Sequence, residues 1–169
     1  MQITVNRHLR RTRNGRTIVR THTRNYSKCF TPVYSGFSKN AKQVMMSPTQ
    51  FLKTTHDQVY QENERMRFRR YSERLKAGKD INALYDDIPD LTSYNDYIKF
   101  VIKREKVEGI KAKLKKCNNL KENEKLPIPF LEYNREGIPV SHEGRHTAQA
   151  CKELKIKKIP VTVDIGKYY

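Results

Sequence analysis

The residues best suited to chemistry lie close together near the carboxyl end of the chain. Glu143, Gly144, Arg145, His146 and Thr147 place a carboxylate, a guanidinium, an imidazole and a hydroxyl around one glycine. A glycine turn that opens a helix exposes free backbone N–H groups at the positive end of the helix dipole, and these attract anions. The spacing therefore predicts a phosphate or nucleotide pocket formed by Gly144, Arg145, His146 and Thr147.

The same cluster would also suit phosphoryl transfer or strand cleavage. Glu143 and His146 are the catalytic candidates: Glu143 as general base or metal ligand, His146 as general acid or phosphate contact, with Arg145 neutralising charge and His142 assisting. The plainer interpretation is that these residues end a strand and face solvent. Metal-assisted hydrolysis would need a second carboxylate. Glu105, Glu108 and Glu132 are acids that could supply this second carboxylate if the fold brings one of them close to the motif.

The cofactor is left open, and a nucleotide with a divalent cation is one candidate. No metal site is predicted from the pattern of histidines and cysteines. Cys29, Cys117 and Cys151 are widely spaced and include no Cys-x-x-Cys pair, which argues against a disulfide framework and favours a reducing compartment. Cys151 is expected to be a buried thiol on the inner face of a helix.

Two short strands, a helix and a third strand must position the motif. Residues 128–133 form an apolar run, 134–137 supply turn residues and 138–141 resume a strand-like pattern, so a β-hairpin is predicted. From residue 145 to about 155, apolar residues recur at three-residue spacing, which is typical of a helix. Alternation of apolar residues over 159–163 predicts a closing strand.

A longer pattern runs through this segment and upstream of it. Its parts are His142-Glu143-Gly144-Arg145-His146, Ala150, Lys152-Glu153-Leu154, Ile159-Pro160-Val161, and the upstream segments 46–52, 107–111 and 127–132. The pattern resembles the ParB/sulfiredoxin-like superfamily, whose signature is a Gly-x-His/Arg-Arg turn, an alanine-rich helix and an Ile-Pro-Val strand. The resemblance is to the ParB-like domains of phage and mobile-element proteins and spans roughly residues 44–165.

The resemblance implies a small domain of helices and strands that binds or turns over nucleotides and phosphate esters. The chain departs from the family at two positions. Sulfiredoxins carry a cysteine immediately after the motif glycine, where this chain has Arg145, so sulfinic-acid repair is not expected. The usual arginine after the histidine is Thr147 here, and a hydroxyl replaces a guanidinium fork only weakly, which argues against nucleotide turnover.

The chain is strongly basic, and its amino-terminal third is the most electropositive part. The 169 residues include 35 Lys+Arg and 18 Asp+Glu, a formal net charge of +17, and no acidic residue precedes Asp57. Residues 1–24 contain arginine but no lysine, and planar guanidinium forks suit phosphates and base edges. These arginines are Arg7, Arg10, Arg11, Arg13, Arg16, Arg20 and Arg24. A nucleic-acid partner is predicted, with DNA favoured over RNA.

This amino-terminal arm, residues 1–43, contains an internal repeat. Residues 5–10 and 19–24 share the pattern Val-x-x-His-x-Arg, and Asn14-Gly15 between them is a hairpin signal. A basic β-ribbon follows, of a width that enters a major groove or lies along RNA. The alternative is a flexible solvated tail. His8 and His22 are expected to pair across the strands or to contact phosphate.

The middle of the chain is predicted to be helical. A first helix is expected from Asp57 to about Ala77, ended by Gly78, and a second helical stretch from Ser93, with a change of phase after Glu105 that indicates two helices or a kink. In the first helix, residues 65–71 interleave basic and aromatic side chains. That pattern suits base stacking, although amphipathic packing is the commoner explanation.

The expected fold is therefore α+β. Helices pack on a small mixed sheet in residues 44–169, with a helical insertion at about 57–117, and the basic hairpin arm precedes them. No apolar run is long enough to span a membrane and no signal-peptide pattern is present, so we expect a location in a host cytoplasm or a virion and no secretion.

Three functions remain open from the sequence. The first is a nucleic-acid-binding ParB-like protein with a glycine-turn pocket for a nucleotide or phosphate. The second is a nuclease or nucleotide-dependent phosphotransferase. The third is a structural component of a viral or other nucleoprotein particle. A homo-oligomer or a nucleoprotein assembly is compatible with the first and third.

Overall fold

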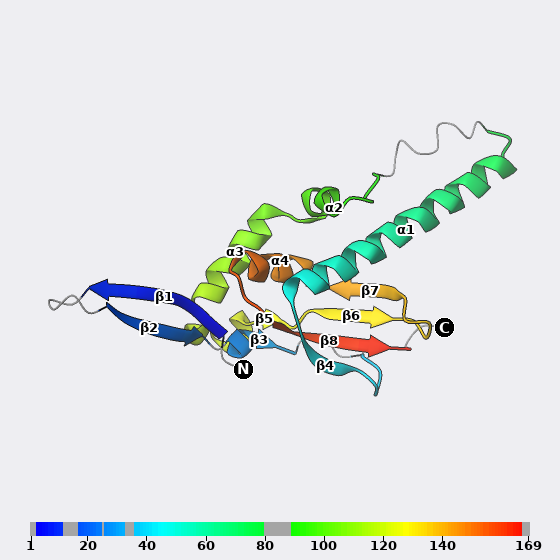
Figure 1. Ribbon diagram of the computed structural model, residues 1–169. Coiled ribbons are helices and arrows are strands. Elements are labelled where there is room, and N and C mark those ends of the chain that lie inside the picture. Colours follow the sequence, from blue (N-terminus) through cyan, green and yellow to red (C-terminus); the bar gives the residue numbers. More distant parts are fainter. Residues whose placement is uncertain (1–2, 12–16, 25, 33–35, 80–88, 167–169) are drawn as a thin grey trace.

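The protein is described by a computed structural model, in which the expected α+β architecture is present (Figure 1). The structure describes residues 3–11, 17–24, 26–32, 36–79 and 89–166.

A four-stranded mixed sheet forms the base of the body. Its strands are, in spatial order, β4 (Lys42–Met46), β8 (Ile159–Ile165), β6 (Phe130–Tyr133) and β7 (Pro139–Glu143). The central pair β6 and β8 is parallel, and the outer pairs are antiparallel. The predicted hairpin and closing strand are thus confirmed, and the second hairpin strand ends at the motif.

The turn of this hairpin is held by Asn134. Its side-chain oxygen accepts hydrogen bonds from the backbone N–H groups of Glu136 and Ile138 at 3.0 and 2.9 Å. An asparagine that bonds the backbone two residues on is a common way to close a turn. The turn fixes the register of β7 against β6, and hence the position at which the motif leaves the sheet.

The long helix α1 (Pro48–Lys76) begins earlier than the sequence pattern suggested. The Ser47 hydroxyl accepts a hydrogen bond from the backbone N–H of Gln50 at 3.1 Å, and Pro48 fills the first helical position. A serine cap followed by proline is a strong start signal, and it makes the predicted start at Asp57 wrong. The predicted end is confirmed, since Gly78 has φ 63° and follows the last helical turn.

Two separate helices follow, which was one of the two predicted alternatives, the other being a single kinked helix. They are α2 (Tyr94–Val101), capped by Ser93 as predicted, and α3 (Arg104–Lys115). The break lies at Ile102, where the backbone is extended and the side chain is buried. The change in hydrophobic phase therefore marks a true interruption, and Gly109 lies inside α3.

The helices cover one face of the sheet. Figure 1 shows α1, α3 and α4 (Arg145–Glu153) on the same side of the strands. Apolar side chains from all three helices and from the inner face of β6 and β8 form the core between the layers. Its fully buried members include Phe51, Leu52, Val107, Leu114, Leu131, Ala148, Cys151, Ile159 and Val161.

The amino-terminal strands form the expected antiparallel hairpin, β1 (Ile3–Arg11) with β2 (Thr17–Arg24). The Asn14-Gly15 turn signal lies outside the described residues. The register is irregular between Thr4 and Arg7, and it sets His8 opposite Arg20. His8 and His22 are therefore not direct register partners, and their predicted contact with phosphate stays a prediction.

The segment that follows the hairpin, residues 26–31, packs with the body, although the predicted arm included it. A 3₁₀ turn, η1 (Tyr26–Cys29), leads into β3 (Phe30–Thr31), which pairs in parallel with β5 (Leu126–Pro127). Tyr26, Cys29 and Phe30 are buried in the core. The separable part of the arm is thus the hairpin itself.

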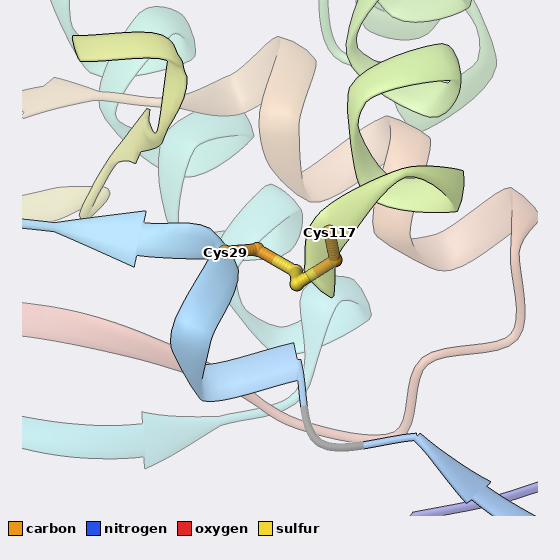
Figure 2. The surroundings of a disulfide bond; sticks show 2 residues. All are labelled: Cys29 and Cys117. Atoms are coloured by element: carbon orange, nitrogen blue, oxygen red, sulfur yellow. A yellow bond between two sulfur atoms is a disulfide. The ribbon is translucent and has the colours of Figure 1, made fainter. Parts of the chain in front are cut away.

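A disulfide joins this segment to the end of α3. Figure 2 shows Cys29 bonded to Cys117, the first residue of the 3₁₀ turn η3 (Cys117–Asn119), with 5.0 Å between their Cα atoms. The expectation of unpaired cysteines is therefore wrong. The two residues are 88 positions apart, and their contact depends on how η1 packs against η3. Cys151, by contrast, is a buried free thiol as predicted.

Candidate functional site

The motif glycine makes the predicted strand-to-helix turn. Gly144 has φ 105° and stands between the end of β7 and the first residue of α4. A Cβ atom at this position would lie 2.6 Å from the Cβ and 2.9 Å from the Cα of Pro129. Both the left-handed backbone and the close approach require glycine. Because Gly144 has no side chain, the N-cap of α4 makes no side-chain hydrogen bond to the N–H groups of the first helical turn.

Arg145 brings a half-buried positive charge to this turn. Its Nη1 lies 3.4 Å from Nε2 of His142, and no described carboxylate lies within salt-bridge distance of it. Lys103, the residue that precedes α3, and Lys106 in α3 are near enough to lower the pKa of His146, as Arg145 does. Three cations therefore lie close enough to act electrostatically on the first turn of α4, which favours an anion there.

The two motif histidines are both held toward the neutral form. Burial and then the Arg145 charge lower the pKa of His142 to about 4. Burial is also the main cause that lowers the pKa of His146, and Glu143 offsets it only in part. The Nε2 atom of His146 is buried and has no hydrogen-bond partner among the described residues. A neutral imidazole is a poor proton donor, which weakens the general-acid role predicted for His146.

The remaining motif residues, Glu143 and Thr147, differ in their exposure to solvent. Glu143 is exposed, and its Oε1 accepts a hydrogen bond from the backbone N–H of Gly144 at 3.3 Å. Thr147 is buried beside Ala148 on the inner side of α4. The structure thus places Arg145 beside His142 and near His146, exposes the Glu143 side chain and buries that of Thr147.

The other acids do not complete a carboxylate pair beside the motif. Glu108 forms ion pairs with Arg104 and Lys111 at 2.6 and 3.0 Å. Glu132 is buried, and because Leu131 is the register partner of His142, Glu132 lies on the opposite face of the sheet. Glu105 is exposed on the first turn of α3. Within the described ranges, no group of three or more His, Cys, Asp or Glu side chains is arranged to hold a metal ion.

Two hydroxyl groups near Arg145 were missed by the sequence analysis. The Tyr97 hydroxyl of α2 and the Thr55 hydroxyl of α1 are 2.5 Å apart, and both residues are fully buried. Burial raises the pKa of Tyr97, whereas the hydrogen bond to Thr55 and the Arg145 charge lower it in part. No local pattern in the sequence links Tyr97 to Arg145.

The predicted nucleic-acid residues lie on the amino-terminal hairpin. Arg7, Arg10 and Arg11 belong to β1, and Arg20 and Arg24 belong to β2. The backbone register sets Arg10 opposite Ile18 and Arg24 opposite Ile3. The other two arginines, Arg13 and Arg16, lie outside the described residues. The two-stranded ladder therefore has one arginine in each of its terminal pairs, Arg24 opposite Ile3 and Arg11 opposite Thr17, and the hairpin sequence contains no acidic residue.

Comparisons complete the description of the site. No described helix has both the length and the apolar character needed to cross a bilayer. Comparison of the chain with protein-family models, with curated proteins and with solved structures found no match. Membership of the ParB/sulfiredoxin-like superfamily therefore stays a prediction based on the motif residues, while the α+β fold rests on the structure itself.

Proposed function

We propose that the protein binds nucleic acid through the β1–β2 hairpin, with DNA preferred over RNA. The observation that carries the proposal is a projecting two-stranded ribbon whose sequence holds seven arginines and no acid (Figure 1). A two-stranded ribbon fits the major groove of B-DNA, and arginine forks bond both phosphates and guanine edges. The net charge of +17 would also favour rapid association with a polyanion.

The glycine-turn pocket has a secondary part in this proposal. The uncapped N–H groups of α4 and the Arg145 guanidinium, which lacks a carboxylate partner among the described residues, support binding of one backbone phosphate or of a nucleotide. ParB-like membership is part of the same proposal. Phosphoryl transfer is the weaker candidate, because Glu143 is exposed and the Thr147 side chain is buried.

The test is the salt dependence of binding to labelled duplex DNA and to an RNA duplex of the same sequence. Each phosphate neutralised on duplex DNA adds about 0.9 to the slope of log K against log salt, so seven arginine contacts would contribute roughly 6. Changing the seven arginines to glutamine should remove most of that slope and most of the affinity.

A control of equal charge separates the hairpin from net charge. Seven exposed lysines of the body can be changed to glutamine instead: Lys113, Lys115, Lys116, Lys121, Lys155, Lys157 and Lys158. This variant should keep most of the wild-type slope. Equal loss in both variants would mean that only total charge matters, and unchanged binding by the arginine variant would refute the proposal.

A further inference from the structure

The distal half of α1 extends away from the body. The last buried residue of this helix is Asn63, whose side-chain amide donates a hydrogen bond to the Pro89 carbonyl at 3.2 Å. From Glu64 to Lys76 every residue is half-buried or exposed. Figure 1 shows this half of the helix reaching beyond the layers formed by the other labelled elements. Packing against the described core therefore does not explain its side chains.

This half of the helix is basic. Residues 64–76 contain six basic and two acidic residues, a net charge of +4. Both acids are already paired within the helix, Glu64 with Arg67 at 2.9 Å and Glu73 with Arg69 at 3.0 Å. Arg65 and Lys76 have no carboxylate partner in the part of the chain that the structure describes. These two side chains therefore carry positive charge that no acid among the described residues neutralises.

An exposed aromatic residue lies in the middle of this basic segment. Phe68 is 72% exposed and is flanked in sequence by Arg67 and Arg69. Together with Glu64, Arg67 and Tyr71 it lines a hollow of about 260 Å³ on one face of the helix. That volume is below the roughly 300–1,000 Å³ of typical small-molecule pockets, and the hollow is open. It suits one flat group laid on the surface better than an enclosed ligand.

We propose that residues 64–76 bind single-stranded nucleic acid, with an unpaired base stacked on Phe68 and neighbouring basic side chains contacting the phosphates. Aromatic rings set in a positively charged surface bind single strands in this way. A duplex would not satisfy Phe68, because its base faces are already stacked on one another. A second copy of the chain would bring the same positive charge to the surface.

This proposal rests on the proposed function, since it takes nucleic acid to be the polyanion, and it adds the class of substrate. The hairpin and the distal end of α1 lie at opposite ends of the molecule in Figure 1. The two surfaces would therefore contact separate stretches of nucleic acid, a duplex at the hairpin and an unpaired strand at α1.

The experiment compares Phe68→Ala with Phe100→Ala in the full chain. Phe100 of α2 is 64% exposed, so it is a matched exposed phenylalanine outside the proposed surface. The probes are a labelled single-stranded oligonucleotide and the corresponding duplex. Loss of one stacked base costs about 1–3 kcal/mol, so Phe68→Ala should weaken single-strand binding by about 5- to 150-fold and leave duplex binding unchanged. Phe100→Ala should change neither, and Phe68→Tyr should retain binding.

Wild-type single-strand affinity in Phe68→Ala, or an equal loss in Phe100→Ala, would overturn the inference. The inference would also be overturned if sedimentation showed a self-association that depends on Phe68 while the affinity for the single strand did not change. If duplex binding through the hairpin arginines persists in those cases, only this inference fails. If the wild-type chain binds neither probe, the proposed function fails with it.

Discussion

Reduction of the Cys29–Cys117 bond should remove a large share of the stability of the fold. The bond closes a loop across a sequence separation of 88 residues. In the chain-entropy treatment, a closed loop of this length restricts the unfolded chain by about 4 to 5 kcal/mol. The total free energy of unfolding of a domain is about 5–15 kcal/mol. The reduced protein is therefore expected to retain only part of its stability.

Urea unfolding with and without a reductant measures this contribution on one and the same sequence. With a slope of about 2 kcal/mol per molar urea, the midpoint should fall by about 2 M on reduction. The Cys29→Ala/Cys117→Ala variant is the control: its midpoint should be low and should not respond to the reductant. Cys151 should contribute nothing to the difference, because burial raises the pKa of its thiol to about 12 and keeps it unreactive.

The reasoning would be refuted by a midpoint that moves by less than about 0.5 M on reduction. It would also be refuted if thiol titration of the non-reduced, denatured chain found three free thiols, because the structure leaves only Cys151 unpaired. The sign of the effect does not depend on the function of the protein, so this measurement tests the fold independently of the two binding proposals.

Two further predictions concern the motif. Gly144→Ala should destabilise the protein by about 3 kcal/mol or more, because backbone strain adds to the close contact with Pro129. Gly137→Ala is the control: Gly137 has φ 77° and no atom within 4 Å of the added Cβ, so this variant should show the strain alone. Similar unfolding midpoints for the two variants would contradict this prediction. His142 has a folded pKa of about 4 against an ordinary value of 6.5, so the unfolded chain takes up a proton first as pH falls. Stability should therefore decrease between about pH 6.5 and pH 4, and His142→Gln should remove that part of the decrease. If NMR shows His142 titrating near pH 6.5 in the folded protein, its low folded pKa is wrong.

Much of the fold was predictable where the signals are local. The hairpin at residues 130–143, the helix that begins at Arg145 and the cap at Ser93 follow from turn residues, spacing and a short polar cap. The predicted start of α1 at Asp57 overlooked a local signal, the Ser47 cap followed by Pro48. The disulfide, by contrast, has no local signal, since no spacing rule links residues so far apart in the chain.

The candidate site likewise contains some features with a local sequence signal and others without one. The Gly144 turn and the position of Arg145 follow from the motif, because glycine and the first helical turn are adjacent in sequence. The hydroxyl pair of Tyr97 and Thr55 comes from two other helices and carries no local signal. The burial of Thr147 follows from the helical period, since it lies four residues before the buried Cys151 on the same face of α4.

The position of the disulfide has a mechanical consequence. The hairpin strand β2 ends at Arg24, and Cys29 follows within a few residues. A pull on the hairpin therefore reaches Cys29 before it reaches β3, whose pairing with β5 involves only two residues of each strand. The covalent bond diverts that tension into the end of α3, the helix that packs against α4. The shortest strand pairing among the described residues is thereby shielded from load applied at the amino terminus.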